Sequence, residues 1–264
     1  MWILCVFTGA LLFSADRCPN LGNPVPDIVR VSRSLSWREA AKDVDSLRPM
    51  LLEQFRHEDF RGRLVLDLGT GEGRLAFVAA SLSARVVGVD LDRVKLMHAR
   101  AYAGIRDFRN AEFVLGDVEK TPYHEFSRDP IDAVISNLCI SPEIVWHSSR
   151  ALRPGGAFIF AAHHGDHWKE TRRGSRFAFF EDSMRDLLEE NHFAIEFMGV
   201  DTTVAEFEHL REVELFLRDK TVRRWVEDGR WQELADAFAR GETHLTLAYL
   251  IVKARRTTAP YTVE

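Results

Sequence analysis

A glycine-rich segment directly after a strand-like run has the residue types needed to bind a small ligand. The segment Asp67–Gly73 has the sequence DLGTGEG and ends the apolar run Leu64–Leu68. A tight turn at the carboxyl end of a strand needs residues that tolerate unusual backbone angles and let a ligand come close to the chain. We therefore expect a ligand at this turn, with an unliganded glycine-rich turn as the alternative.

The spacing of the glycines separates two classes of ligand. In the dinucleotide fingerprint Gly-x-Gly-x-x-Gly, counted from Gly69, the third glycine would fall at position 74, which is Arg74. Here the third glycine is Gly73, one position early. The carboxylates of Asp67 and Glu72 repel phosphate groups and suit a cationic or amine-bearing ligand.

Two more acidic residues follow the next two strand-like runs. Asp90 directly follows the run Arg85–Val89, and Asp117 comes two residues after the run Ala111–Leu115. A carboxylate can accept two hydrogen bonds at once, as a pair of neighbouring hydroxyl groups requires. The alternatives are that Asp90 caps the following helix, although Asp92 is better placed to do so, and that Asp117 is a turn residue.

These segments, taken in order, resemble the motifs of class I S-adenosylmethionine-dependent methyltransferases. One glycine loop alone is weak evidence, whereas five segments in the right order and spacing are strong evidence. The resemblance covers roughly residues 63–162 of the chain. The matching segments are Val65–Gly73, Val87–Asp90, Gly116–Val118, Ile131–Asn137 and Leu152–Gly156.

The resemblance implies S-adenosylmethionine as the cofactor and a role for each acidic residue. Asp90 would hold the two ribose hydroxyls, Asp117 would contact the adenine amino group, and the backbone at Val118 would contact the adenine ring. Asn137 would offer a hydrogen bond near the methyl group. The cofactor contacts that the resemblance implies are Asp67, Gly69, Thr70, Gly71, Gly73, Asp90, Leu91, Asp117, Val118 and Asn137.

The candidate catalytic residues are Asn137, His163 and His164. The two histidines follow the strand-like run Ala157–Ala162, at the end of a strand where ligands bind in such sheets. An imidazole titrates near neutral pH and can take a proton from an acceptor. A base is optional, because a sulfonium methyl group is already electrophilic, and ordinary polar loop residues are the alternative. We expect no metal site, since adjacent residues of a strand point in opposite directions.

The residues after Asn137 exclude one class of acceptor. Enzymes of this fold that methylate base amines or glutamine amides have a Pro-Pro-aromatic motif there, whereas this chain has Leu138–Ser141 (LCIS). The leading hypothesis is methyl transfer to an oxygen, nitrogen or carbon atom of a small or carrier-bound metabolite. The alternatives are an RNA or protein methyltransferase and a cofactor-binding regulatory protein without turnover. The net charge of −5 disfavours nucleic acid as the partner.

The elements that must position these residues alternate between strand-like and helix-like runs. Near-continuous apolar strands with helices between them predict a parallel sheet covered on both faces. Together with the resemblance, this predicts an α/β fold: a doubly wound, mostly parallel seven-stranded sheet with helices on both faces and an antiparallel last strand. The expected strands are residues 64–68, 85–89, 111–115, 131–136, 157–162, 193–199 and 244–253.

The sequence predicts an amino-terminal extension followed by one domain. We expect residues 1–35 to form an amino-terminal extension and residues 36–264 the methyltransferase domain, with a helical insertion at about 204–240. The capping-box pattern of Ser36 and Glu39 predicts the start of the first helix.

The amino terminus and the cysteines bear on the cellular compartment. The apolar run Trp2–Phe13 is too short to span a bilayer and lacks the preceding basic residues of a signal peptide. The three cysteines, Cys5, Cys18 and Cys139, fit no disulfide framework and no metal-ligand spacing. These features predict a cytoplasmic protein without a membrane span, and they leave the oligomeric state open.

Overall fold

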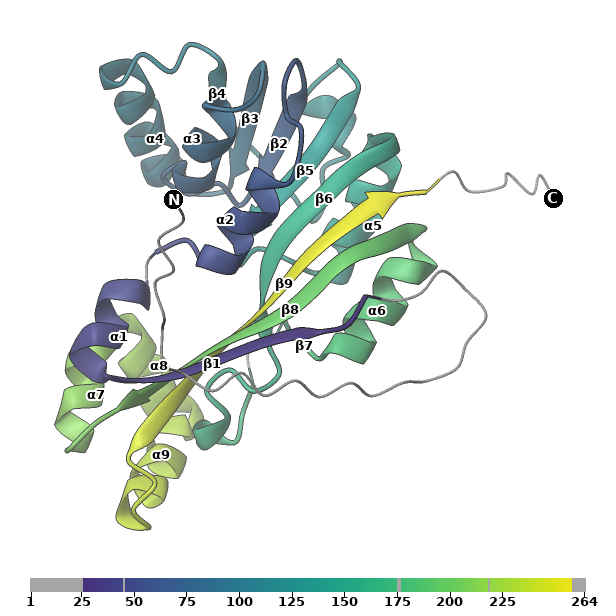
Figure 1. Cartoon of the computed structure of the whole chain (residues 1–264). Coiled ribbons are helices and arrows are strands. Elements are labelled where there is room, and N and C mark those ends of the chain that lie inside the picture. Colours follow the sequence, from purple (N-terminus) through teal and green to yellow (C-terminus); the bar gives the residue numbers. More distant parts are fainter. Residues whose placement is uncertain (1–25, 45, 175–176, 218, 258–264) are drawn as a thin grey trace, which may run out of the picture.

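A single mixed β-sheet runs through the described part of the chain (Figure 1). The computed structural model describes residues 26–44, 46–174, 177–217 and 219–257. The run Trp2–Phe13 and the cysteines Cys5 and Cys18 lie outside these residues, and so do the expectations placed on them.

The sheet has the strand order β1-β8-β9-β6-β5-β2-β3-β4, with the short strand β7 paired to β6. Only β9 runs antiparallel to its neighbours β6 and β8, which confirms the predicted fold class and its antiparallel last strand. The seven expected strands are present, and β1 and β7 are additional. The strands are β1 (Val29–Ser36), β2 (Leu64–Leu68), β3 (Arg85–Asp90), β4 (Ala111–Leu115), β5 (Ile131–Asn137), β6 (Leu152–His164), β7 (Ala178–Phe179), β8 (Phe193–Glu206) and β9 (His244–Arg256).

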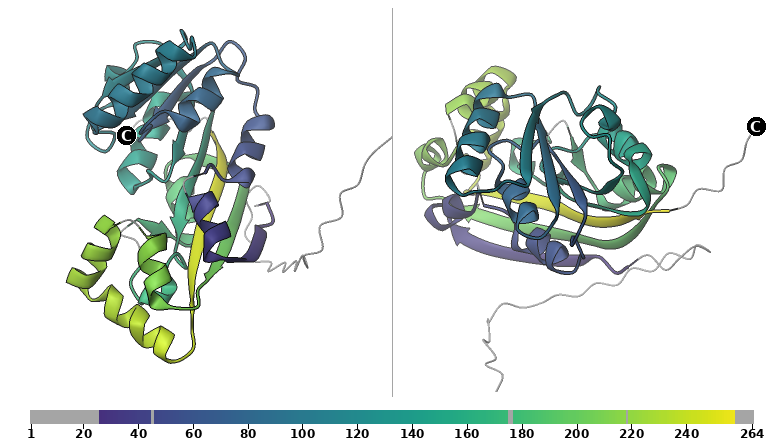
Figure 2. Two further views of the ribbon diagram at one scale, coloured as in Figure 1. Left: turned by 90° about the vertical axis from the view of Figure 1, so that its left-hand side faces the viewer. Right: turned by 90° about the horizontal axis from the view of Figure 1, so that it is seen from above.

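Helices cover both faces of this sheet (Figure 2). Alternate residues of each strand belong to two separate hydrophobic cores, so that Val65 of β2 faces one core and Leu66 faces the other. The core that contains Val65 is covered by α1–α4 and α7–α9, and the other core is covered by α5 and α6. The helices are α1 (Trp37–Val44), α2 (Pro49–Arg56), α3 (Arg74–Ala80), α4 (Arg93–Ile105), α5 (Pro142–Ala151), α6 (Glu181–Glu190), α7 (Leu210–Phe216), α8 (Asp219–Asp228) and α9 (Arg230–Ala239).

All but the last residue of strand β1 lie in the range 1–35 that we expected to form an amino-terminal extension. It pairs in parallel with β8, from Val29 opposite Gly199 to Ser36 opposite Glu206, and forms the edge of the sheet. Helix α1 then begins at Trp37 as predicted, and the Glu39 carboxylate accepts hydrogen bonds from the Ser36 N–H at 3.2 Å and hydroxyl at 2.7 Å. Edge strand and first helix thus follow one another without a loop.

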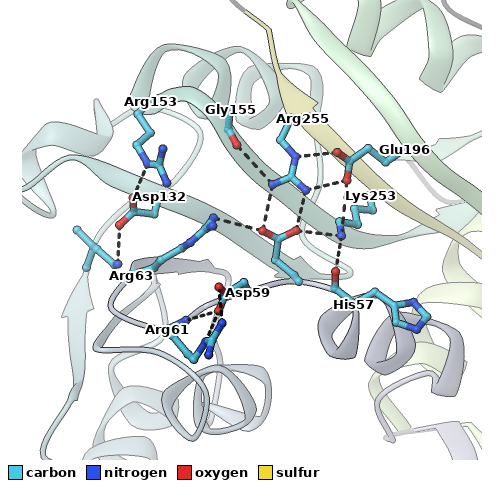
Figure 3. A network of polar contacts seen from close by, with 12 residues as sticks. His57, Asp59, Arg61, Arg63, Asp132, Arg153, Gly155, Glu196, Lys253 and Arg255 are labelled. Carbon is cyan, nitrogen blue, oxygen red and sulfur yellow. Dashed lines mark hydrogen bonds and ion pairs between the residues drawn. The ribbon is translucent and has the colours of Figure 1, made fainter.

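A network of ion pairs fixes the chain after α2 to the far end of β9 (Figure 3). The Glu58 side chain is only 4% exposed and accepts hydrogen bonds from Arg255 at 2.7 and 3.0 Å. It also pairs with Lys253 Nζ at 2.9 Å and Arg63 Nη1 at 3.3 Å. Glu196 of β8 accepts from Arg255 at 2.8 Å. The network therefore holds the carboxyl end of α2 against the sheet just before β2 begins.

Candidate cofactor and methyl-transfer site

The glycine loop after β2 adopts backbone angles that only glycine enters readily. Gly69, Gly71 and Gly73 have φ values of 66°, 56° and 83°. The Gly73 N–H donates to the Thr70 carbonyl at 2.9 Å, and the Thr70 N–H donates to the carbonyl of Val89 on the neighbouring strand at 3.0 Å. These bonds close the turn, so that α3 starts directly after it.

Gly69 also needs to be glycine because Cys139 lies against it. A Cβ atom at Gly69 would be 2.4 Å from Cys139 Cβ and 2.6 Å from its sulfur. Burial, and secondarily the nearby charges of Asp90 and Asp67, raise the pKa of the Cys139 thiol to about 12. The thiol is therefore protonated at neutral pH, as suits a packing residue rather than a nucleophile.

Asp67 lies at the base of a cavity of about 240 Å³ beside the loop. Its carboxylate is 1% exposed and accepts a 2.6 Å hydrogen bond from the Thr70 hydroxyl. Burial raises the pKa of Asp67 to about 7, although the bond from Thr70 acts against this rise. A cation brought into the cavity would stabilise the ionised form of this carboxyl group. The cavity is lined by Leu47, Asp67, Gly69, Thr70, Gly71, Glu72, Arg74, Leu75, Lys95 and Asn137.

Asp90, at the end of β3, connects the glycine loop to the start of α4. One of its carboxylate oxygens accepts from the Gly71 N–H at 2.7 Å, and the other accepts from the Asp92 N–H at 2.8 Å. Each oxygen keeps acceptor capacity for a ligand hydroxyl. Asp92 is the residue that caps α4, since its side chain accepts from Val94 N at 2.9 Å and Lys95 N at 3.2 Å. Asp90 is therefore not needed as a helix cap.

The residues after β4 form a hydrogen-bonded turn. Asp117 accepts from the Glu119 N–H at 3.0 Å and pairs with Lys120 Nζ at 3.1 Å, and Lys120, then Glu119, hold its pKa below the usual range. The carbonyl of Val118 accepts from the Tyr123 hydroxyl at 3.0 Å. These contacts are those of a turn residue, the alternative role for Asp117. A ligand amine would have to share the Asp117 carboxylate with the exposed Lys120 ammonium.

The two candidate histidines at the end of β6 lie on opposite faces of the sheet. Alternation along β6 places His163 on the same face as Ala161, in the core that contains Val65 of β2, and places His164 in the other layer. His164 is buried, with Nε2 3.0 Å from Glu181 Oε2 and Nδ1 accepting from the Asp166 N–H at 3.1 Å. His164 thus has a structural environment away from the cavity and is not placed to act as the base.

Asn137 and His163 share the face of the sheet that also carries Asp67. Asn137 ends β5 and pairs in register with Ala161, and His163 follows two residues later on β6. We call this face, at the carboxyl ends of β2, β5 and β6, the cofactor face. It brings together residues separated by almost a hundred positions in the sequence. Of the three candidate catalytic residues, the structure therefore unites Asn137 and His163 only.

His163 belongs to a cluster of rings that the sequence did not reveal. Its ring lies 4.2 Å from that of His167 and 5.9 Å from that of Tyr249, measured between centroids. Burial lowers the pKa of His163 to about 4, so the imidazole is neutral at pH 7. Within the described residues, its buried Nδ1 atom has no hydrogen-bond partner. A neutral imidazole can accept a proton at its unprotonated nitrogen, and the lowered pKa makes this imidazole a weaker base than an exposed histidine.

Other members of this cluster come from distant segments. Trp168 packs against His167 at 4.4 Å and edge-on against Trp225 of α8 at 4.9 Å. The guanidinium of Arg48 lies 4.4 Å from the Tyr249 ring centre. Trp168 also has a φ of 62°, a left-handed conformation that bulky residues rarely adopt and that often marks a functional site. His163 and His164 at the end of a strand-like run were the only signal of this cluster that the sequence analysis used, and they carry no information about the partners on α8 and β9.

The comparisons with known proteins decide the family. A family model described as a methyltransferase domain matches residues 59–212, more than half of the chain. The chain belongs to the class I S-adenosylmethionine-dependent methyltransferases. A solved S-adenosylmethionine-dependent methyltransferase from Mesorhizobium loti shares this fold, with a TM-score of 0.53, 21% identity, and coverage of 84% of this chain and 100% of that one.

Relatives of this methyltransferase act on different acceptors. The arsenite methyltransferase of Aquipseudomonas alcaligenes is 33% identical over 117 residues, which is 40% of this chain and 34% of that protein. The ribosomal protein L11 methyltransferase of Clostridium botulinum (strain Eklund 17B) is 36% identical over 138 residues, 50% of this chain and 41% of that protein. The chain thus spans less than half the length of these two curated relatives.

The donor set of the methyltransferase fits S-adenosylmethionine. The cavity offers the buried carboxyl group of Asp67 to a cation, and the glycine loop forms its wall. Asp90 has acceptor capacity for the ribose, and Leu91 beside it is 65% exposed and offers an apolar surface to the adenine ring. Among the described residues, no group of three His, Cys, Asp or Glu side chains is placed to hold a metal ion, and no helix is long and apolar enough to cross a membrane.

Proposed function

We propose that this methyltransferase transfers the methyl group of S-adenosylmethionine to an oxygen or nitrogen atom of a small or carrier-bound metabolite. The observation that carries the proposal is the imidazole of His163, on the same face of the sheet as Asn137 and two residues beyond its β6 partner Ala161, with a buried nitrogen that lacks a hydrogen-bond partner among the described residues. Methylation of oxygen or nitrogen releases a proton, and this nitrogen can accept it.

Each residue of the site has a stated task in this proposal. The cofactor supplies an electrophilic methyl group when it is bound. Asp67 holds the amino group of the cofactor, Asp90 holds the ribose hydroxyls, and the Asp117–Val118 turn holds the adenine. Asn137 orients the acceptor by a hydrogen bond, and His163 takes the proton. Positioning of this kind can remove roughly 7 kcal/mol or more from the barrier in favourable cases.

The depth of the ring cluster favours a small acceptor. His167 is 1% exposed, and its Nδ1 lies 3.1 Å from the N–H and 3.2 Å from the carbonyl oxygen of Ala248, so Ala248 satisfies this nitrogen in either tautomer. Within the described residues, neither this Nε2 nor the indole nitrogen of Trp168 has a hydrogen-bond partner. Buried nitrogen atoms without partners suit an acceptor molecule that brings polar groups into the cluster. A bulky folded substrate would reach this depth only through an extended segment.

The first experiment asks whether methyl transfer occurs and to what. Labelled S-adenosylmethionine is incubated with the protein and cell extract, and the labelled product is sorted by size. We expect label in the small-molecule fraction, or in a carrier fraction from which mild hydrolysis releases it. Label in neither, despite tight binding of S-adenosylhomocysteine by calorimetry, would favour a regulatory protein without turnover and overturn the proposal.

The second experiment tests His163 as the base. The variant His163→Gln keeps a polar side chain but lacks the proton acceptor of imidazole. We expect kcat to fall at least about a hundredfold with unchanged affinity for S-adenosylhomocysteine. The control is His124→Gln, at an exposed histidine of the short helix Tyr123–Glu125, which should leave kcat unchanged. Equal activity of both variants would remove His163 from the mechanism.

A protein acceptor is the second candidate function. It is favoured by the match to ribosomal protein L11 methyltransferases, which covers half of this chain at 36% identity. The same labelling experiment separates the two, since label that stays with a protein after denaturation and hydrolysis of esters would identify N-methylation of a polypeptide.

A further inference from the structure

Helix α4 presents an apolar stripe to the outside of the molecule. Val94, Met97, Ala101 and Ile105 recur at intervals of three and four residues and therefore line one side of the helix. Val94 is 58% exposed, Met97 57% and Ile105 81%. The stripe is opposite to the side that packs against the sheet, which is formed by Leu96, Ala99 and Ala103. An amphipathic helix normally turns its polar side outward, so this exposed stripe needs an explanation.

The position of α4 leaves this stripe accessible in the described structure. The helix packs on β3 and β4, and β4 is the last strand at its end of the sheet. Figures 1 and 2 show α4 at the outer edge of the molecule, with its outer side away from the sheet. A single helix at an edge presents a convex surface, which fits a soft or flat partner better than a protruding one.

Basic side chains border the stripe on both sides. Residues 92–109 contain five Lys and Arg but only two acidic residues, in a chain whose net charge is −5. Helical geometry places Arg93 and Arg100 on one side of the stripe and Lys95 and Arg106 on the other. Of these, Lys95 lies 3.9 Å from Asp92 and lines the cofactor cavity, and the Arg100 guanidinium donates to the Phe113 carbonyl of β4 at 2.6 and 3.2 Å. Arg93 and Arg106, one on each side of the stripe, have no carboxylate partner among the described residues.

We propose that the outer face of α4 docks on an anionic lipid surface. Apolar side chains flanked by Lys and Arg are the arrangement by which a helix lies in the interface of a membrane. The apolar stripe enters the boundary of the acyl chains, while the long basic side chains reach the headgroups. The charge of the flanks complements the negative surface of a bilayer that contains acidic lipids.

A second copy of the chain fits this surface less well. Two copies that met stripe to stripe would bring the basic flanks of both helices together, since both flanks of each stripe carry the same sign. Like charges brought face to face disfavour the pair, and no acidic row on α4 offsets them. Lipid headgroups, in contrast, supply the opposite charge on both sides at once.

Sedimentation with vesicles tests the proposal on the full chain. The protein is mixed with vesicles of phosphatidylcholine alone or with added phosphatidylglycerol. We expect binding that needs phosphatidylglycerol, weakens with salt and falls at least about tenfold in the double variant Met97→Glu/Ile105→Glu. The matched control is Leu215→Glu/Val226→Glu, which changes two equally exposed apolar residues of α7 and α8, at 67% and 61%, and should bind like the native protein.

Three results would overturn the proposal. The first is absence of binding to the acidic vesicles, and the second is equal binding by the α4 variant and the native chain, which would place any lipid contact elsewhere. The third is a concentration-dependent dimer in solution that the α4 variant dissolves, which would assign the stripe to a second copy. Binding of S-adenosylhomocysteine should be the same in all variants, so that a misfolded protein is recognised independently of the lipid result.

Discussion

Gly69 and Cys139 are in direct contact, and this contact joins the two halves of the site. Gly69 belongs to the loop after β2, and Cys139 follows Asn137 in the loop after β5. Leu138 lies between Asn137 and Cys139 in this loop, and its N–H donates to the Ala161 carbonyl of β6 at 2.8 Å. This bond ties the loop after β5 to the strand that carries His163. The proposed cofactor loop, Asn137 and His163 are thus mutually positioned through one small side chain.

Replacing Gly69 by alanine should abolish cofactor binding. The added Cβ would overlap Cys139 at 2.4 Å, and alanine must also adopt a φ of 66°. We expect no measurable binding of S-adenosylhomocysteine by calorimetry, in a protein whose circular dichroism still shows the fold. The control Gly62→Ala has nearly the same φ, 68°, but no atom within 4 Å of the new Cβ, and should retain affinity. Equal losses in the two variants would show that the backbone angle, not the contact with Cys139, is responsible.

Asp90 and Asp92 make a matched pair for testing the ribose contact. Asp90→Ala removes the acceptor for Gly71 and for two hydroxyls, and charged hydrogen bonds of this kind contribute about 1.5–3 kcal/mol each. We expect the affinity for S-adenosylhomocysteine to fall at least about tenfold. Asp92→Ala removes the cap of α4 and the exposed pair with Lys95, so it should lower the melting temperature slightly and leave the affinity intact. A loss of affinity in Asp92→Ala alone would contradict the assignment.

Cofactor affinity should depend on pH through Asp67. Burial raises the pKa of this carboxyl group to about 7, so below that pH it is mostly protonated and ionising it costs folding stability. The amino group of the cofactor favours the ionised form, so binding should release a proton and weaken as the pH falls below about 7. Calorimetry in buffers of different ionisation enthalpy measures this release, and Asp67→Asn should eliminate it. A pH-independent affinity in the native protein would separate Asp67 from the cofactor.

The pH dependence of turnover should differ from that of binding. Since burial lowers the pKa of His163 to about 4, this base is already neutral over the range in which an ordinary histidine titrates. With saturating cofactor, we expect kcat to show no inflection near 6.5 and to fall only toward the lower pKa. If kcat shows an inflection near pH 6.5 that persists in His163→Gln, another group titrates. If the inflection disappears in His163→Gln, His163 titrates like an exposed histidine, which would contradict its burial.

The order of the elements was predictable, because it depends on patterns local in the sequence. The runs that became β2 and β4 have the predicted bounds, and Asp92 caps α4 as its position before the helix suggested. Helix α4 continues through Gly104 to Ile105, and the chain turns at Asp107 with a φ of 56°. A helix can tolerate one glycine when its buried side remains packed, as Ala103 is here.

The depth and the partners of the site were not predictable from local patterns. The alternation of a strand implies that His163 and His164 face opposite ways, but only the pairing of β6 with β5 and β9 decides which one meets the cofactor face. The low pKa of His163 arises from burial, to which Tyr249 of β9 contributes from a distant part of the chain. No spacing rule contains that information.

The Glu58 network should contribute strongly to stability. Glu58→Ala would leave the Lys253 ammonium, whose side chain is 8% exposed, and the Arg255 guanidinium with only Glu196 as a carboxylate partner. Removing one member of a buried ion pair costs about 3 kcal/mol, measurable by urea unfolding. The control Asp59→Ala removes an exposed partner of Arg61 next to it in Figure 3 and should change the unfolding midpoint little.

The same network predicts how stability changes in acid. Burial alone would raise the pKa of Glu58, but hydrogen bonds from Arg255 and Lys253 outweigh it and hold the pKa below its usual 4.5. A lowered pKa gives stability that is present above the usual value and lost as the pH falls through it toward the folded value. Between about pH 7 and about pH 4, native protein should therefore lose more free energy of unfolding than Glu58→Ala. Parallel losses in the two proteins would show that Glu58 is not ionised in the fold.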